Sequence, residues 1–232
     1  MEKQKMIIGI VGILVATIVI IVGVSAYTQQ NSSVDETEIT TTPPTTESLQ
    51  SILEKAETIE SLSYDIALTI TMPQYGTQTA TMNIWQEKPY FKEQILSTTM
   101  GITNTIIIIQ RPEGTYVYDA AQGKYVLTTE VSSYVTSLQY LDSKMIKDLL
   151  NNQSITDFET DIVDGKKATV IEYTLPLVGE NLMTIQVWIW NEKGVPLKAY
   201  IDMTMEDISM TMDFVFGNYS FADIPDSTFN VT

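Results

Sequence analysis

Hydrophobic and polar residues alternate with a period of two along most of the chain after residue 60. Residues 64–72 start this pattern, with apolar side chains at the even positions from Tyr64 to Met72. Such alternation is typical of a β-strand with one buried face. The β-branched run at residues 105–110 predicts a central strand that is buried on both faces. Further strands are predicted at residues 79–84, 90–96, 115–119, 124–127, 155–163, 167–175, 183–190, 197–205 and 208–219.

Two segments follow the helical period instead. Residues 47–61 place Leu49, Ile52 and Leu53 on one side and charged residues on the other. Residues 135–151 carry a second apolar stripe, which consists of Leu138, Leu141, Met145 and Leu149. Both patterns predict amphipathic helices with one face against a core.

Short, turn-rich connections join the predicted strands. Asp164-Gly165 is the strongest hairpin signal, because this dipeptide suits the left-handed turn between paired strands. No repeated strand–helix–strand pattern is present, which favours antiparallel pairing. A sheet of this width tends to curl. We therefore expect an α+β fold, in which a curved antiparallel sheet of about eleven strands forms an incomplete β-barrel closed by helices.

The first residues predict a membrane segment ahead of this domain. Residues 6–26 contain no charged residue, and roughly 20 apolar residues suffice to span a bilayer. Lys3 and Lys5 precede the segment, so the positive-inside rule places the C-terminal part on the extracytoplasmic side. We expect residues 1–27 to form an N-terminal transmembrane helix that anchors the chain in its own membrane. The alternative is a cleaved signal peptide, since residues 24–26 are small, and the domain would then be secreted.

Residues 28–46 are rich in Thr, Ser, Gln and Asn and contain Pro43-Pro44. Nothing in this segment can bury apolar surface, so it predicts a disordered polar tether. The remaining residues, 47–232, have the length of one domain.

Charge and missing residue types exclude several functions. The net charge of −16 argues against a nucleic-acid partner, because phosphates need a basic surface. Cysteine and histidine are both absent, which removes disulfides, the usual zinc sites and histidine-dependent catalysis. No nucleophile motif is present either. We expect a protein that is not an enzyme and has no cofactor.

Two sets of acidic residues are candidate metal ligands. Alternating carboxylates on one predicted strand face offer the oxygen ligands that calcium prefers, namely Asp157, Glu159 and Asp161. A second set comprises Asp202, Glu206, Asp207 and Asp213. Rows of this kind are more often the solvated face of a strand, so no metal site is predicted.

The apolar faces of four strands carry the candidate site. Their shared parity predicts either an ordinary core or an apolar cavity for a lipid or acyl chain. The chain has 11 methionines, whose flexible side chains adapt to irregular apolar shapes. Trp85, Trp188 and Trp190 fall on the opposite parity. The candidate cavity-lining residues are Ile66, Leu68, Ile70, Met82, Ile84, Leu197, Ile201, Met203, Met210, Met212 and Phe214.

Four segments together resemble the LolA-like lipoprotein carriers. Residues 84–92 (Ile-Trp-Gln-Glu-Lys-Pro-Tyr-Phe-Lys) resemble their segment with Lys-Pro followed by an aromatic and a basic residue. Residues 112–119 and 187–197 are similar to two of their hairpins, and residues 224–231 resemble their closing Pro-Asp-x-x-Phe strand. The order of these segments agrees with the family from residue 47 to residue 232.

This resemblance implies an incomplete antiparallel β-barrel closed by helices, with an apolar cavity for acyl chains. The family includes soluble carriers, mycobacterial lipid carriers and periplasmic stress sensors that bind lipoproteins. This chain departs from the soluble carriers by its expected anchor. Arg111, its single arginine, does not match the position of the carriers' lid arginine.

Two functional hypotheses follow. The first is extracytoplasmic binding of a lipid or of the acyl chains of a lipoprotein, in a carrier or sorting role. The second is a cell-envelope sensor or scaffold that binds a partner protein through its sheet without a lipid ligand.

Overall fold

The structure is a computed structural model that describes residues 47–99, 102–128, 146–147, 158–176, 182–205 and 208–231. The predicted membrane segment, the tether and most of the predicted helix at 135–151 lie outside these residues. Within the described ranges, no helix has the length and apolar character needed to cross a bilayer.

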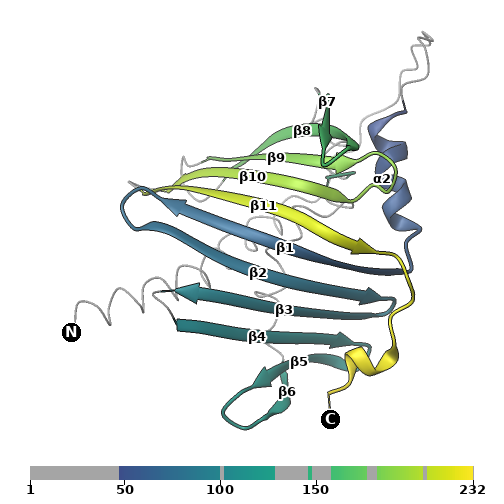
Figure 1. Cartoon of the computed structure of the whole chain (residues 1–232), viewed down its shortest axis with the longest axis vertical. Coiled ribbons are helices and arrows are strands. Elements are labelled where there is room, and N and C mark those ends of the chain that lie inside the picture. Colours follow the sequence, from purple (N-terminus) through teal and green to yellow (C-terminus); the bar gives the residue numbers. More distant parts are fainter. Residues whose placement is uncertain are drawn as a thin grey trace.

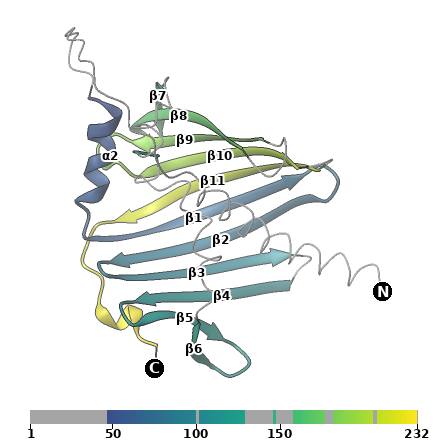
Figure 2. The same ribbon diagram turned by 180° about the vertical axis from the view of Figure 1, so that it is seen from behind.

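One antiparallel sheet contains all eleven strands of the described ranges (Figures 1 and 2). The strand order is β6-β5-β4-β3-β2-β1-β11-β10-β9-β8-β7, so the chain builds outward from the β1–β11 pair in both directions. β6 and β7 are the two edges, and the sheet stays unclosed between them. The strands are β1 Ser61–Met72, β2 Gly76–Glu87, β3 Tyr90–Thr99, β4 Ile102–Arg111, β5 Gly114–Asp119, β6 Lys124–Thr128, β7 Phe158–Val163, β8 Lys166–Pro176, β9 Leu182–Trp190, β10 Pro196–Met205 and β11 Ile208–Ser220.

The predicted α+β class, the strand count and the antiparallel pairing are confirmed. The β7–β8 hairpin turns at Asp164 and Gly165, whose φ values of 50° and 75° are both positive. A two-residue turn with two such residues matches the twist of the flanking strands. The predicted hairpin turn at Asp164-Gly165 is thus confirmed, and both residues adopt the left-handed conformation on which the prediction rests.

Helix α2 (Leu49–Glu57) lies along the ends of the strands in the β8–β11 half of the sheet (Figure 1). The Ser48 side chain caps its N-terminus by accepting a hydrogen bond from the Ser51 N–H. The helix is shorter than the predicted 47–61 and ends at the C-cap residue Thr58, whose hydroxyl donates to the Lys55 carbonyl. The period-two pattern of β1 begins three residues later.

A main apolar cluster joins α2 to one face of the sheet, from β3 to β8. We call this the inner face, and the opposite one the outer face. Leu49, Ile52 and Leu53 bring the buried stripe of α2 to this cluster. Buried side chains of β1, β2, β8, β9, β10 and β11 form most of the remainder, and alternate residues of these strands share the face as the pattern predicts.

A second, smaller cluster lies on the outer face under the short helix η3 (Asp226–Phe229). Phe229 and Ile224 pack with Ile109 of β4, which is fully buried. The tail reaches this place because the Ser61 hydroxyl donates to the Ala222 carbonyl and Glu87 accepts from the Ile224 N–H. Burial of β4 on both faces is confirmed at Ile108 and Ile109, and Thr103, Asn104 and Thr105 of the same strand are exposed.

Candidate ligand-binding face

The inner face brings together the residues that the sequence marks as cavity-lining. Met212 of β11 lies between Ile70 of β1 and Ile201 of β10, and Ile66 faces Met82 of β2. Ten of the eleven candidates belong to the main cluster, with Leu68 only partly buried. Leu197 is also buried, at 2% exposure, but it is outside that cluster. The shared parity is therefore confirmed, whereas the use of this face as a cavity stays a prediction.

The sequence interpretation missed the contribution of β8 and β9 to the same face. Ile185 pairs with Ile201 and Tyr173, and Val187 pairs with Ala199 and Ile171. All of these side chains are buried in the main cluster. Their alternation along residues 183–190 was visible in the sequence and would have identified them.

Methionines line the end of the inner face that is remote from α2. Met203 of β10 pairs with Met183 of β9 on one side and with Met210 of β11 on the other. Met72 ends β1 at the same level, because its neighbour Thr71 pairs with Thr211. All four side chains are 2–3% exposed. Unbranched thioether side chains repack easily, so this row is the most adaptable part of the face.

Aromatic rings close the opposite end, next to α2. The Tyr64 ring lies 5.2 Å from the Tyr219 ring and 6.1 Å from the Phe216 ring, measured between centroids. The Tyr219 hydroxyl donates to the Pro196 carbonyl, and burial raises the pKa of this hydroxyl far above its usual range. Rigid rings held by a buried hydrogen bond resist displacement. The face thus has one rigid end and one adaptable end.

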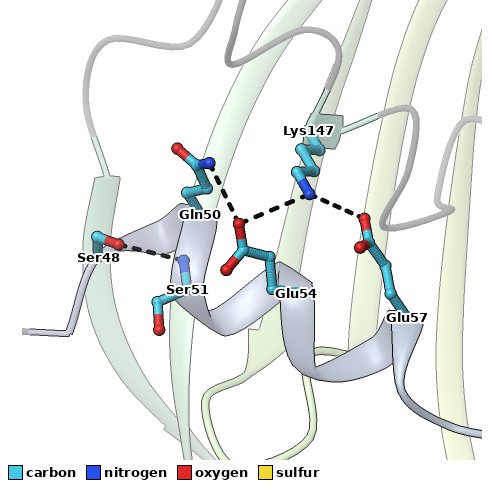
Figure 3. A network of polar contacts seen from close by, with 6 residues as sticks. All are labelled: Ser48, Gln50, Ser51, Glu54, Glu57 and Lys147. Carbon is cyan, nitrogen blue, oxygen red and sulfur yellow. Dashed lines mark hydrogen bonds and ion pairs between the residues drawn. The ribbon is translucent and has the colours of Figure 1, made fainter.

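Residues 146–147 pack against the main cluster and α2. Ile146 is fully buried in the main cluster. The Lys147 Nζ lies 2.9 Å from Glu57 Oε1 and 3.7 Å from Glu54 Oε1 (Figure 3). The hydrogen bond to Glu57 and the two carboxylates raise the pKa of Lys147. Polar contacts on the rim therefore attach these residues at the rigid end of the inner face.

One charged group lies within the inner face. Glu93 of β3 pairs with Ile84 of β2 and Ile108 of β4, and both of these are buried. Its side chain is 1% exposed. Desolvation by burial raises the pKa of the Glu93 carboxyl to about 7. The sequence interpretation did not single out this residue.

The three tryptophans lie on the outer side of the sheet strands, as their parity predicts, and each has a lysine over its ring. Lys92 Nζ is 5.1 Å from the Trp85 ring centroid, and Lys198 Nζ is 4.6 Å from that of Trp188. Lys166 Nζ is 5.3 Å from the Trp190 centroid. The tryptophan rings thus make cation–π contacts with lysines of the same domain.

The acidic sets show no metal centre in the described part of the chain, where no group of three or more potential ligands lies together. Glu159 and Asp161 are exposed, and Asp161 accepts a 2.9 Å hydrogen bond from Trp188 Nε1. Asp202 is exposed and Asp213 half-buried on the outer face. Asp157, Glu206 and Asp207 lie outside the described residues.

No known family model and no curated protein matches this sequence. Solved structures do match the fold. A LolA superfamily protein of Nitrosomonas europaea has a TM-score of 0.41 and 13% identity, over 80% of this chain and 98% of its own. LprF of Mycobacterium bovis has a TM-score of 0.39 and 14% identity, over 76% and 94%.

A structure of the MucA/MucB complex of Pseudomonas aeruginosa has a TM-score of 0.44 and 12% identity, over 79% of this chain and 61% of the matched one. The matched structures thus include the family that the sequence motifs resemble. At these identities and TM-scores, the likeness says nothing about ligand or partner.

Proposed function

We propose that the domain binds the apolar chain of a lipid or an acylated protein against its inner face, in a carrier or sorting role. The observation that carries this proposal is the continuous apolar cluster from β3 to β8 on one face of an unclosed sheet. A sheet that does not close can separate its edges and admit a ligand without losing a backbone pairing. An apolar chain would replace side-chain contacts with ligand contacts of the same kind.

The two ends of the face give the ligand a direction. The ring cluster of Tyr64, Phe216 and Tyr219 closes the end beside α2. At the other end, the row of Met183, Met203 and Met210 offers side chains that change rotamer at low cost. We infer that an acyl chain lies with its tail over the methionine row and its polar head toward the ring end.

We further propose that this binding takes place on the extracytoplasmic side of a membrane. The charge asymmetry around residues 6–26 supports this orientation, and the domain would stay tethered or be secreted according to the fate of that segment. The proposed role is binding, not catalysis, because the chain has no histidine or cysteine for acid–base or nucleophilic chemistry.

A pair of tryptophan substitutions on β11 tests the proposal. Met210→Trp fills the methionine row from inside, whereas Val215→Trp adds the same bulk on the outer face, where Val215 is 48% exposed. We expect Met210→Trp to weaken binding of a fluorescent long-chain alcohol by about tenfold or more, a loss of about 1.4 kcal/mol. Val215→Trp should bind as the wild type does. Equal binding by both variants would place the ligand elsewhere or exclude it.

A second candidate function is binding of a partner protein at the β7 edge. Phe158 and Ile162 of this strand are 50% and 71% exposed, and in the described residues β7 pairs only with β8. An edge strand with exposed apolar side chains can pair with an added strand. A photo-crosslinking residue at Ile162 should then capture a cell-envelope protein, and one at exposed Glu172 should not.

A further inference from the structure

Glu93 is placed where an apolar ligand would pass. It lies in the fourth strand from the β6 edge, with Ile84 beside it on β2 and Ile108 beside it on β4. Phe91 and Ile95, two residues away on the same strand and the same face, pack against the main cluster. The carboxyl group is therefore enclosed by apolar side chains along and across the strands.

This carboxyl group combines burial with the lack of a hydrogen bond or ion pair to any residue in the described part of the chain. Asp65, for comparison, accepts hydrogen bonds from Asn83 at 2.6 Å and from Asn218 at 2.8 Å. Glu87 accepts from the Ile224 N–H at 3.1 Å. For Glu93, burial is the single cause of the raised pKa, and no hydrogen bond or cation offsets it. Buried polar groups in folded proteins normally have partners, so a buried exception is informative.

We propose that Glu93 binds the polar head of an amphiphilic ligand whose head is a hydrogen-bond-donating cation, such as the amine of a long-chain alkylamine. This inference rests on the proposed function, because it names the class of ligand that the inner face accepts. The apolar tail lies along the main cluster, and the amine donates to the carboxylate of Glu93. The ligand thus supplies the partner that the described residues lack.

Charge complementarity favours a cationic head over a carboxylate head or a hydroxyl head. A fatty acid would bring a second carboxylate beside Glu93, and two like charges in an apolar site repel each other. The chain as a whole has a net charge of −16, which also disfavours an anionic ligand. A long-chain alcohol offers one neutral donor and no charge. A charge-assisted hydrogen bond from an amine is stronger than the neutral one.

The surroundings of Glu93 make its titration separable from that of other groups. On the inner face, the neighbours from β2 and β4 are Ile84, Ile108, Gln86 and Gln110, and none of them titrates. Glu87 and Lys92 belong to the outer face. The chain contains no histidine.

The test uses three photoactivatable 12-carbon probes that differ only in the head: an amine, a hydroxyl or a carboxylate. The full chain is held in nanodiscs of a zwitterionic phospholipid, and labelled peptides are assigned by mass spectrometry. The variants are Glu93→Gln and the matched control Glu172→Gln, which makes the same change at an exposed position of β8. Partition of each probe into the nanodisc is common to all variants and cancels in the comparison.

At pH 8.5 we expect the amine probe to label inner-face peptides of the wild type about tenfold more than the hydroxyl probe. Glu93→Gln should reduce amine labelling to the hydroxyl level, and Glu172→Gln should leave it unchanged. At pH 5.5, where the carboxyl of Glu93 is protonated and the amine still charged, the wild type should lose its preference. An excess of butylamine, which has no tail, should not compete.

Equal amine and hydroxyl labelling in the wild type would overturn the role of Glu93 and leave the proposed function standing. Unchanged amine labelling in Glu93→Gln would overturn it in the same way. Competition by butylamine would assign the site to an amine without a lipid tail, such as a lysine of a protein, and would also overturn it. Labelling of no inner-face peptide by any probe would overturn the proposed function together with this inference.

Discussion

The two halves of the sheet use the same alternating pattern but differ in what covers them. In the β8–β11 half, the inner face is mainly apolar and α2 packs against its end. In the β2–β4 half, the inner face contains the buried carboxyl of Glu93, and it is the outer face that gains a cover, from η3. Alternation therefore shows which residues share a face, whereas it does not show which segment covers that face.

The contact between α2 and the β9–β10 turn gives the largest expected effect. A Cβ atom at Gly194 would clash with the Ile52 carbonyl oxygen, and the φ of +73° at Gly194 disfavours other residues. We expect Gly194→Ala to destabilise the domain by about 4 kcal/mol, because backbone strain and a backbone clash act together. Urea unfolding measures the difference.

Gly123 is the matched control for that substitution. Its φ is +65°, and a Cβ atom there would meet no atom within 4 Å. Gly123→Ala should cost about 1 kcal/mol from the left-handed conformation alone. Equal losses for the two variants would mean that the close packing of α2 on this turn contributes nothing to stability.

Glu93 predicts a pH dependence of stability between its unfolded and folded pKa values. Its pKa is about 7 in the folded domain against 4.5 without burial, so the folded state holds more protons between these values. The free energy of unfolding should therefore fall as pH rises from 4.5 to 7, by about 3 kcal/mol in total. Glu87, whose pKa is lowered by its hydrogen bonds, acts below this window.

Unfolding measurements at pH 5 and pH 8.5 check this prediction. Glu93→Gln should remove the fall between the two pH values, and Glu172→Gln should retain it. A wild-type domain with equal stability at both pH values would show that the Glu93 carboxyl is solvated or paired.

The sequence predicts which residues lie on the inner face where alternation is strict, as at Ile66, Leu68 and Ile70. The place of Glu93 could not be predicted, because residues 90–96 read Tyr-Phe-Lys-Glu-Gln-Ile-Leu and have no clean period. In addition, a charged residue in such a run is normally expected in solvent. The packing of η3 over Ile109 could not be predicted either. Residues 226–229, which form η3, reach Ile109 through long-range contacts that no local pattern encodes.

The smallest expected effect concerns the ion pairs between Lys147 and α2. Lys147→Gln removes the ion pairs with Glu54 and Glu57, whose side chains are 49% and 52% exposed. Solvent screens such pairs, so the loss of stability should be small. Thermal melts at low and high salt check it: the difference from the wild type should shrink as salt rises. A large loss that does not change with salt would indicate a packing role for Lys147.

Native mass spectrometry of the wild-type protein, released gently from the cells that produce it, tests the central claim most directly. Ligand binding at the inner face predicts a population with the mass of the chain plus one lipid or acyl-bearing molecule, which collisional activation removes. Met210→Trp should lose that population, and Val215→Trp should keep it. A wild-type protein found only at the mass of the polypeptide, with an intact cooperative melt, would contradict the proposed function and identify the inner face as a packed core.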